Sequence, residues 1–531
     1  MMYDILIKNG TIVDGTGTKP YVKDLAIKDG KIHFVDGNAD AARVIDASGR
    51  LVTPGFIDTH SHSSMLVNVE PELSPKIFQG ITTELLAQDG MGPAPVDDKN
   101  KKTWEQAMAG LEGEFEFPSK FKWNSVDDYL NIANKLDLGP NLAYLAPHGN
   151  IRMVSMGLEN RKPTPEEMEK MKEELQKAID EGAYGMSTGM IYPPCVYADV
   201  EEFIELGKVL AKNDAVFVTH QRSEADAMLE SMDEIFKIGR ESGCRIHFSH
   251  FKICGKNNWD KVPKILEKLD QAKEEGIRVS FDQYPYVAGS TMMSVILPPW
   301  VHDGGTIKML ERLNDAKLRE KMKEDIKNGI PGWDNFIDFA GLDGIFITFV
   351  KNTESEKYVG MSLVELGEAT GKDPYDAIFD LIRDEENIIG LVDFYGTEEH
   401  VKTFMSRPEQ NVCTDGIIGG KPHPRLYGAF ARVLGKYCRD EKLFPVETAI
   451  RKMTGKPADT IGIKDRGYLK DGYNADVLVI DFDNIIDVGD YTNPKQYAKG
   501  ILYSIVNGNI IIDEGKATHQ KAGQVLRFEG R

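Results

Sequence analysis

The chain has few cysteines, no long apolar run and no excess of positive charge. Its five cysteines are an odd number among 531 residues and include no Cys-x-x-Cys pair, which argues against a disulfide framework and favours a reducing compartment. No apolar stretch is long enough to span a membrane, and the first residues lack the basic and apolar regions of a signal peptide. We therefore expect a cytoplasmic protein with no membrane partner.

Acidic residues outnumber basic ones. The 84 Asp and Glu against 64 Lys and Arg give a formal net charge of −20. Such a chain repels nucleic acid and anionic lipid, so we expect neither as a partner. The length allows at least one large core, and a decorated barrel fits it as well as two or three domains.

Both ends of the chain have the pattern of short β-strands. The first residues alternate in polarity, with turn signals at Asn9-Gly10 and Asp29-Gly30. Near the C-terminus, the apolar runs 501–506 and 510–512 flank Asn507-Gly508, as in a hairpin. We predict that residues 1–54 and 469–531 together form one small β-sandwich domain.

The middle of the chain alternates strands and helices. Thr164 is a candidate N-cap, and Pro165 with Glu167 completes the pattern of a capped helix start. Further along, the pattern predicts helices around 224–240 and 259–275, between the expected strands 215–220, 245–250 and 277–282.

This alternation predicts an α/β fold, a (β/α)8 TIM-like barrel over residues 55–468. A doubly wound open sheet is the alternative, but no Gly-x-Gly-x-x-Gly follows the first strand. Residues about 296–350 break the rhythm with charged, helix-rich sequence and are interpreted as an insertion. That insertion either covers the barrel mouth or decorates the surface without contacting substrate.

The segment Gly55-Phe-Ile-Asp-Thr-His-Ser-His62 carries the first chemical signal. Side chains at positions i and i+2 of a strand share one face, so His60 and His62 can point two imidazoles at one metal ion. The pair follows an apolar strand, at the strand end where barrel enzymes keep their chemistry. A metal site is favoured over two merely hydrogen-bonded histidines.

Other expected strands end in residues of the same kind. The candidates are Asp89, His220, His250 and Asp415. Each alone is weak evidence, because an Asp-Gly is usually a turn and a strand-terminal His is often only hydrogen-bonded. Together they provide the imidazole and carboxylate ligands and the nearby base, here Asp415, that a metal-assisted hydrolase requires.

Longer segments point to a family. The segments VTPGFIDTHSH, EGAYGMSTGMIYPP, HFSHFK, DQYPYVAGST and TDGIIGGKPHPRLYGAFARVLGKY follow one another along the chain. In these motifs the chain resembles an amidohydrolase-superfamily member, and more closely the D-aminoacylase (N-acyl-D-amino-acid deacylase) family. The match spans nearly the whole chain apart from the stretch around 300–350.

The resemblance implies two neighbouring metal sites. Their ligands would be His60, His62 and Asp415 in one, and His220 and His250 in the other. The ligand shared by the two sites is commonly a cysteine in the family, and Asp89 stands at that position here. A carboxylate can bridge two metals but is a harder ligand than a thiolate. We expect one or two Zn²⁺ ions per subunit, or another divalent metal.

The resemblance also implies a grip on the substrate carboxylate. The matching residues are Lys252, Tyr284, Ser290 and Arg425. Arginine can bind a carboxylate through two parallel hydrogen bonds, and lysine and hydroxyl groups add donors. The alternatives are ordinary surface ion pairs for Lys252 and Arg425, and packing or turn roles for Tyr284 and Ser290.

The implied activity is hydrolysis of the amide bond of small N-acyl-D-amino acids, which gives a carboxylate and a free D-amino acid. Asp415 would take a proton from water and return it to the leaving nitrogen. A D-residue dipeptidase would use identical chemistry. A cyclic-amide hydrolase of the hydantoinase or dihydroorotase type often uses a carboxylated lysine, and no lysine lies near Asp89. A non-catalytic scaffold on this fold would be expected to have lost metal ligands, but the four histidines and Asp415 are all present.

Overall fold

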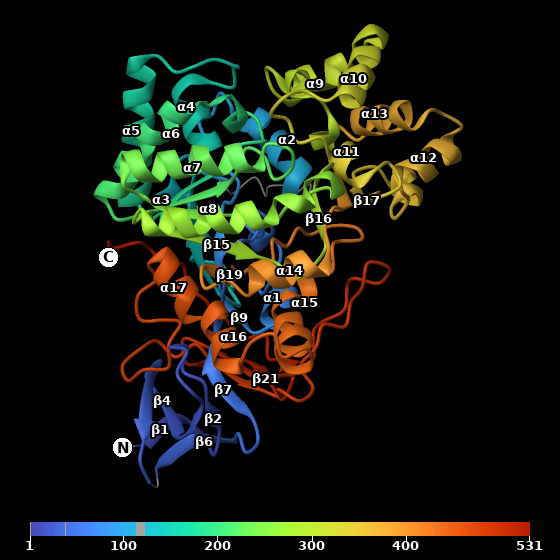
Figure 1. Cartoon of the computed structure of the whole chain (residues 1–531). Helices are drawn as coiled ribbons and strands as arrows, with labels where there is room; N and C mark the ends of the chain where they lie inside the picture. Colours follow the sequence, from blue (N-terminus) through green and yellow to red (C-terminus); the bar gives the residue numbers. More distant parts are fainter. Residues whose placement is uncertain (1, 38, 113–122, 531) are drawn as a thin grey trace.

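The computed structural model describes residues 2–37, 39–112 and 123–530. Figure 1 shows a β domain at the bottom, the barrel above it and a third group of helices and strands beside the barrel. The barrel strands run in parallel in the order β8, β9, β10/β11, β12, β13, β14, β15 and β19. A parallel bridge between Ser61 and Gly416 joins the last strand to the first and closes the barrel.

Buried apolar residues make up most of these barrel strands, as expected for parallel strands covered on both faces. Their bounds are β8 Phe56–Asp58, β9 Ile81–Leu86, β10 Asn141–Tyr144, β11 Ala146–Pro147, β12 Gly185–Gly189, β13 Val216–His220, β14 Arg245–Phe248, β15 Val279–Gln283 and β19 Gln410–Val412. The fold class predicted from the alternating pattern, a TIM-type barrel with a sandwich built from both termini, is confirmed.

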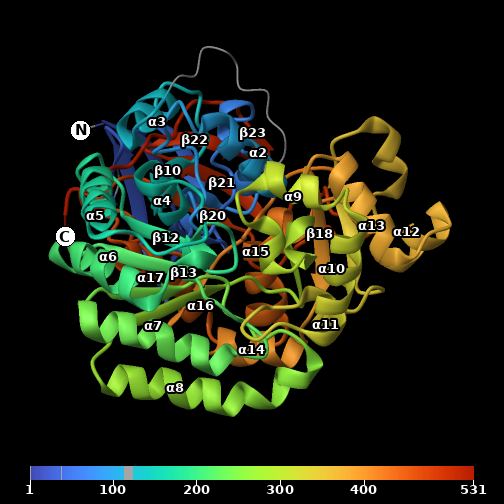
Figure 2. The same ribbon diagram turned by 90° about the horizontal axis from the view of Figure 1, so that it is seen from above.

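Amphipathic helices cover the outside of the barrel (Figure 2). They include α3 Val126–Ala133, α4 His148–Met156, α5 Pro165–Asp180, α6 Val200–Lys212, α7 Met228–Ser242, α8 Val262–Glu274, α14 Glu398–Met405, α16 Val446–Met453 and α17 Gly455–Ile461. The capping box predicted for α5 is present: Glu167 N donates to Thr164 Oγ1 at 3.3 Å, and Thr164 N donates to Glu167 Oε2 at 2.8 Å.

The β domain is a sandwich of two sheets. One consists of β1 Met2–Lys8, β4 Asp24–Lys28, β5 Lys31–Val35 and β6 Asp40–Asp46; the other contains β2 Thr11–Ile12, β3 Tyr21–Val22, β7 Leu51–Pro54, β20 Val477–Ile480, β21 Ile501–Val506, β22 Asn509–Asp513 and β23 Lys516–Ala517. β7 pairs with β20, so the two chain ends share a sheet. In the β21–β22 hairpin, Asn507 and Gly508 both have positive φ (49° and 82°), as a type I′ turn requires.

The third group, the insertion module, has a core of its own, which reaches from Met293 to Leu391. Its antiparallel sheet has the order β16–β18–β17, formed by Ala288–Met292, Ile389–Phe394 and Ile345–Val350. Its helices are α9 Thr306–Arg312, α10 Ala316–Asn328, α11 Phe336–Ala340, α12 Leu363–Thr370 and α13 Pro374–Asp384. The stretch expected to be helix-rich therefore also contributes a strand, which pairs with residues far along the chain. The domain boundaries expected from the sequence stay predictions.

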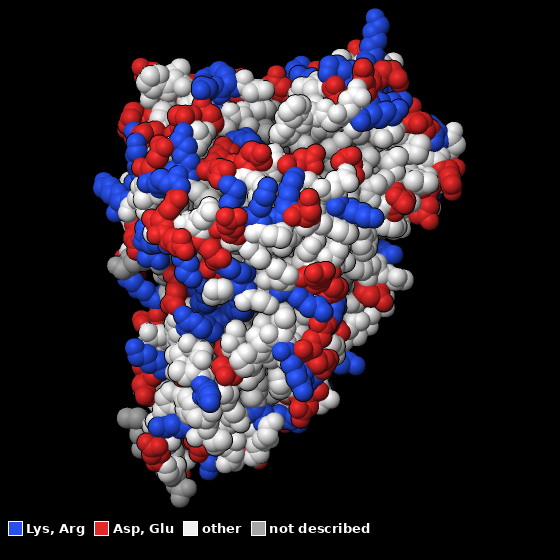
Figure 3. Space-filling model, in the orientation of Figure 1, with Lys and Arg blue, Asp and Glu red and all other residues white. Residues whose placement is uncertain are grey.

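The surface carries charges of both signs. On the face shown in Figure 3, acidic and basic side chains lie close together over the barrel helices. Among the described residues, no helix is long and apolar enough to cross a membrane. All five cysteines are buried and free.

Candidate metal centre

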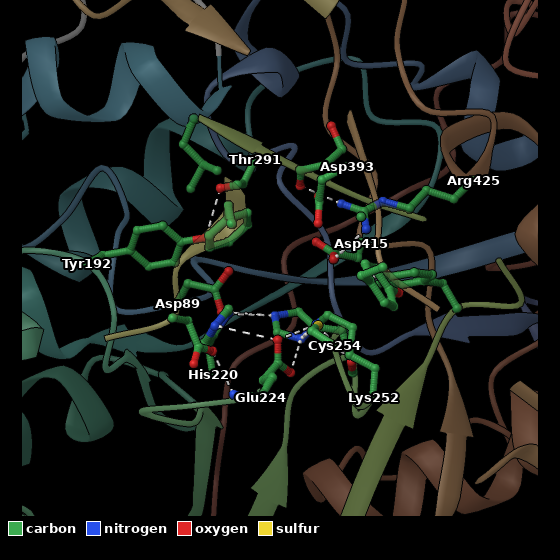
Figure 4. Close-up of a pocket in the computed structure, with 18 of the residues that line it drawn as sticks. Asp89, Tyr192, His220, Glu224, Lys252, Cys254, Thr291, Asp393, Asp415 and Arg425 are labelled. Atoms are coloured by element: carbon green, nitrogen blue, oxygen red, sulfur yellow. Dashed lines mark hydrogen bonds and ion pairs between the residues drawn. The ribbon is translucent and has the colours of Figure 1, made fainter. Parts of the chain in front are cut away.

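The predicted ligands come together at the carboxyl ends of the barrel strands (Figure 4). His60 and His62 follow β8, Asp89 follows β9, His220 ends β13, and His250 and Asp415 follow β14 and β19. All six side chains are buried. Because parallel strands end at one rim of a barrel, residues more than 350 positions apart meet in a single site.

The first cluster contains His60, His62 and Asp415. The two Nε2 atoms lie 3.3 Å apart, and His62 Nε2 lies 3.1 Å from Asp415 Oδ1. His60 Nε2 is 3.5 Å from the same oxygen. Asp415 N also donates to the His60 carbonyl oxygen at 2.9 Å, which fixes the end of β19 against that of β8.

Asp89 lies between this cluster and the next. Its Oδ2 is 3.5 Å from Nε2 of both His60 and His62, while its Oδ1 is 3.8 Å from His250 Nε2. Asp89, His250 and Asp415 have positive φ angles of 56°, 35° and 48°. Non-glycine residues adopt a positive φ at a cost in free energy, and residues with such strained backbones occur mainly at functional sites.

The second cluster contains His220, His250 and Glu224. His220 Nδ1 lies 3.0 Å from His250 Nε2, and His250 Nδ1 lies 3.2 Å from Glu224 Oε1. Glu224 was not among the predicted site residues. It lies in the loop after β13, four positions beyond His220, and that spacing of a carboxylate from a strand-ending histidine is the signal that could have identified it.

These donors fit a divalent metal ion. Within each of the groups His60–His62–Asp415, His60–Asp89–His250 and His220–Glu224–His250, the ligand atoms lie within 4.8 Å of one another. Asp89 Oδ1 is buried without a hydrogen-bond partner among the residues the structure describes, and a buried carboxylate oxygen is costly unless it is paired or bound to a metal. Imidazole nitrogen and carboxylate oxygen are ligands that zinc accepts.

Electrostatics keep His220, Glu224 and Asp415 in the protonation states that can bind a metal ion. Burial lowers the pKa of His220 to about 3, so its imidazole is neutral. Burial raises the pKa of Glu224, but the nearby charges, Lys252 foremost, lower it to about 2. Burial likewise opposes ionisation of Asp415, yet the Arg425 guanidinium holds the pKa of this carboxyl well below its usual range.

The predicted carboxylate-binding residues line the same cavity. Arg425 is fully buried, with Nη1 2.8 Å from Asp415 Oδ2 and its guanidinium 4.4 Å from the centre of the Tyr284 ring. Lys252 Nζ pairs with Glu224 Oε2 at 2.6 Å. Ser290 Oγ donates to the Leu391 carbonyl at 2.8 Å. Lys252 and Arg425 are therefore not surface ion pairs.

Two further histidines have distinct positions. His423 Nδ1 accepts from Arg425 N at 2.9 Å and its Nε2 donates to the Ala288 carbonyl at 3.0 Å, so it holds the start of the helix α15 Arg425–Arg432 against β16. His148 begins α4 directly after β11, and its Nε2 is 2.8 Å from Glu202 Oε1.

A buried lysine supports the first cluster from below. Lys76 Nζ, from α1 Ser74–Ile77, lies 2.8 Å from Asp58 Oδ2, 2.7 Å from Glu84 Oε1 and 2.9 Å from Thr414 Oγ1. Asp58 in turn accepts from Thr414 N at 2.9 Å. The residue before Asp415 is thereby tied to the strand that leads to His60. No local sequence pattern indicates this network, because its partners come from separate strands.

The insertion module reaches the cavity. Asp334, Phe336 and Phe339 line it from the α11 region, and Asp393 lines it from β18. The helix α2 Lys101–Glu112 contributes Leu111. The module is thus in contact with the site rather than a remote surface decoration.

Comparison with known protein families identifies the family of the chain. The pattern of the Amidohydrolase family matches residues 43–320 and 405–512. The chain belongs to the amidohydrolase family.

Proteins named as D-aminoacylase and N-acyl-D-glutamate deacylase are among the relatives that match the chain over its full length. The chain is 32% identical to a D-aminoacylase of Alcaligenes xylosoxydans xylosoxydans over 99% of its own length and 97% of that protein. Its structure resembles the crystal structure of an N-acyl-D-glutamate deacylase of Bordetella bronchiseptica in complex with zinc and a phosphonate inhibitor, with a TM-score of 0.84, 31% identity and coverage of 99% and 100% of the two chains. A crystal structure of D-aminoacylase matches with a TM-score of 0.82 and 30% identity, over 99% of this chain and 100% of that one.

Proposed function

We propose that the protein is a metal-dependent hydrolase of N-acyl-D-amino acids, which it converts to a carboxylate and a free D-amino acid. The observation that carries the proposal is the convergence, in one cavity, of histidine–carboxylate clusters with the buried cations Arg425 and Lys252. The histidine–carboxylate clusters supply the hydrolytic chemistry, and the buried cations can bind a substrate carboxylate. Relatives over the full length act on this substrate class by name.

Zinc is the proposed metal. His60, His62 and Asp415 would form one site, His220, His250 and Glu224 the other, and Asp89 lies where it can bridge them. The relative from Bordetella bronchiseptica binds zinc. A divalent ion in such a site polarises an acyl carbonyl and lowers the pKa of water.

Asp415 is the proposed general base and acid. Its Oδ1 faces His60 and His62, while its Oδ2 is held by Arg425. The low pKa keeps it ionised before reaction, so that it can accept a proton from water. As the water loses that proton, its oxygen bonds to the acyl carbon. Asp415 then returns the proton to the amide nitrogen, the C–N bond breaks, and the carboxylate and the free amine are released.

Arg425 is the proposed anchor of the substrate α-carboxylate, together with Lys252. Arg425 Nε has no hydrogen-bond partner within the described chain and is buried, so it retains a donor that a ligand can use. The guanidinium of Arg425 lies over the Tyr284 ring, 4.4 Å from the ring centre. Arg425 would hold the substrate carboxylate on one side, and the scissile amide would lie beside the histidine–carboxylate clusters. These two fixed points orient the α-carbon and so give selectivity for one enantiomer.

The test measures bound metal and stereoselectivity in one sample. Elemental analysis of the purified protein is expected to show zinc or another divalent metal, and N-acetyl-D-methionine is expected to be hydrolysed in preference to N-acetyl-L-methionine. Asp415→Ala is the matched control, expected to keep its fold by circular dichroism and to lose turnover. Hydrolysis without preference for the D form would contradict the proposal, as would full activity of the metal-loaded Asp415→Ala protein.

A further inference from the structure

One acidic side chain of the cavity has no side-chain partner among the residues that the structure describes. Four of the carboxylates that line it are engaged: Asp415 by Arg425, Glu224 by Lys252, Asp89 by His60 and Asp334 by Ser223. Asp393 has no ion pair within 4.0 Å, and its carboxyl group accepts a hydrogen bond from no residue in the described ranges other than its own backbone amide. Yet Asp393 is only 2% exposed.

Asp393 lies in the cavity wall beside a glycine. Asp393 is paired with Gly289 across the β16–β18 ladder, and both residues line the cavity. A Cβ atom on residue 289 would lie 2.8 Å from Asp393 Oδ1 and 3.2 Å from the Tyr395 ring, closer than side chains normally pack, so a larger residue there would displace the carboxylate. Figure 4 shows Asp393 between Thr291 and Arg425, on the opposite side of the cavity from His220 and Glu224.

A purely structural role does not account for Asp393. Burial of an unpaired carboxylate is costly, and proteins compensate such groups with a partner. Here burial raises the pKa of Asp393 to about 7, although Lys252 and Arg425 lower it in part. Neither cation needs Asp393 as a counter-charge, because Lys252 pairs with Glu224 at 2.6 Å and Arg425 with Asp415 at 2.8 Å.

We propose that Asp393 binds a cationic group of the substrate, an ammonium or a guanidinium. The inference rests on the proposed function and narrows its substrate class. The substrate would carry a carboxylate bound by Arg425 and Lys252 and, near it, a positive charge bound by Asp393. Two sources supply that charge: the free α-amino group of a dipeptide whose C-terminal residue is a D-amino acid, or the basic side chain of the D-amino acid itself.

Three substrates distinguish these sources. N-acetyl-D-methionine has neither cation, L-alanyl-D-methionine has the α-amino group, and N-acetyl-D-lysine has the basic side chain. For each, kcat/KM is measured with the metal-loaded wild-type protein and with Asp393→Asn, which keeps the shape of the side chain and removes its charge. The readout is the ratio of kcat/KM for a cationic substrate to that for N-acetyl-D-methionine.

The wild-type ratio is expected to exceed one for at least one cationic substrate, and Asp393→Asn is expected to lower that ratio about ten- to hundredfold, the value of one charge-assisted hydrogen bond. Asp334→Asn is the matched control: it removes a carboxylate of the same cavity that already has partners, and the ratio should not change. A fall only with the dipeptide assigns the α-amino group, and a fall only with N-acetyl-D-lysine assigns the side chain.

Equal losses of kcat/KM on all three substrates would overturn the cation site, because a structural role of Asp393 predicts that result. A wild-type preference for N-acetyl-D-methionine over both cationic compounds would also overturn it. If the wild-type protein hydrolyses none of the three, the proposed function fails. The cation site is then judged by calorimetric affinities for the same compounds, and equal affinities would refute it.

Discussion

Replacing the buried Lys76 tests how the first cluster, His60, His62 and Asp415, is held in place. The ammonium group has two carboxylate partners, Asp58 at 2.8 Å and Glu84 at 2.7 Å, and both are fully buried. Lys76→Met keeps an unbranched side chain, one atom shorter, and removes the charge. Two carboxylates would then remain in the interior without a cation.

The expected loss is large. Removing one partner of a buried ion pair costs about 3–5 kcal/mol, because the other charge stays desolvated. With two carboxylates depending on Lys76, we expect a loss of at least about 3 kcal/mol from the free energy of unfolding at neutral pH. That is a large share of the total stability of about 5–15 kcal/mol that is usual for a protein.

Urea denaturation of the metal-free protein, followed by circular dichroism, measures this loss. Lys308→Met is the control, since Lys308 forms an exposed pair with Glu311 at 2.7 Å and such pairs contribute at most about 1 kcal/mol. In the Lys76→Met background, Glu84→Gln is expected to recover part of the stability by removing one uncompensated charge. A loss below about 1 kcal/mol, or no recovery in the double variant, would refute the reasoning.

Three further changes test other parts of the structure. Burial raises the pKa of Glu112 from 4.5 to about 7, so the folded chain holds this proton more tightly than the unfolded chain, and stability falls as the pH rises from 4.5 to 7. In urea titrations, the Glu112→Gln protein should therefore be more stable than the wild type by up to about 3 kcal/mol at pH 8 and equally stable at pH 4. Asp89→Asn removes the charge between the two clusters, and elemental analysis should show less metal per chain than in the wild type. Thr164→Ala removes the cap of α5 and should cost about 1 kcal/mol by thermal unfolding; an unchanged melting temperature would contradict it.

Local patterns predicted much of the fold. Alternation of strands and helices, the capping box at Thr164 and the Asn507-Gly508 hairpin are encoded within a few residues, and the structure contains each of them. The metal-ligand candidates could be found for a related reason: each lies at or just after the end of a strand, and barrel topology brings strand ends together.

Features that depend on pairing across long distances could not be predicted in this way. The structural role of Lys76 depends on its contact with Thr414, 338 positions later. Asp393 reaches the cavity because β18 pairs with β16, about a hundred residues earlier. Glu224 is in a loop, where no periodicity indicates the direction of a side chain. In each case the partner, and not the residue type, decides the role.

Closure of the barrel has a consequence for how the protein is made. His62 and Asp415 are separated by 353 positions, and the bridge that joins their strands is the last of the barrel to become possible during synthesis. A ribosome-bound chain shorter than about 415 residues has the histidines but lacks the carboxylate that completes their cluster. The nascent chain is therefore expected to remain inactive until the final barrel strand has emerged, and metal retention can report that the barrel has closed.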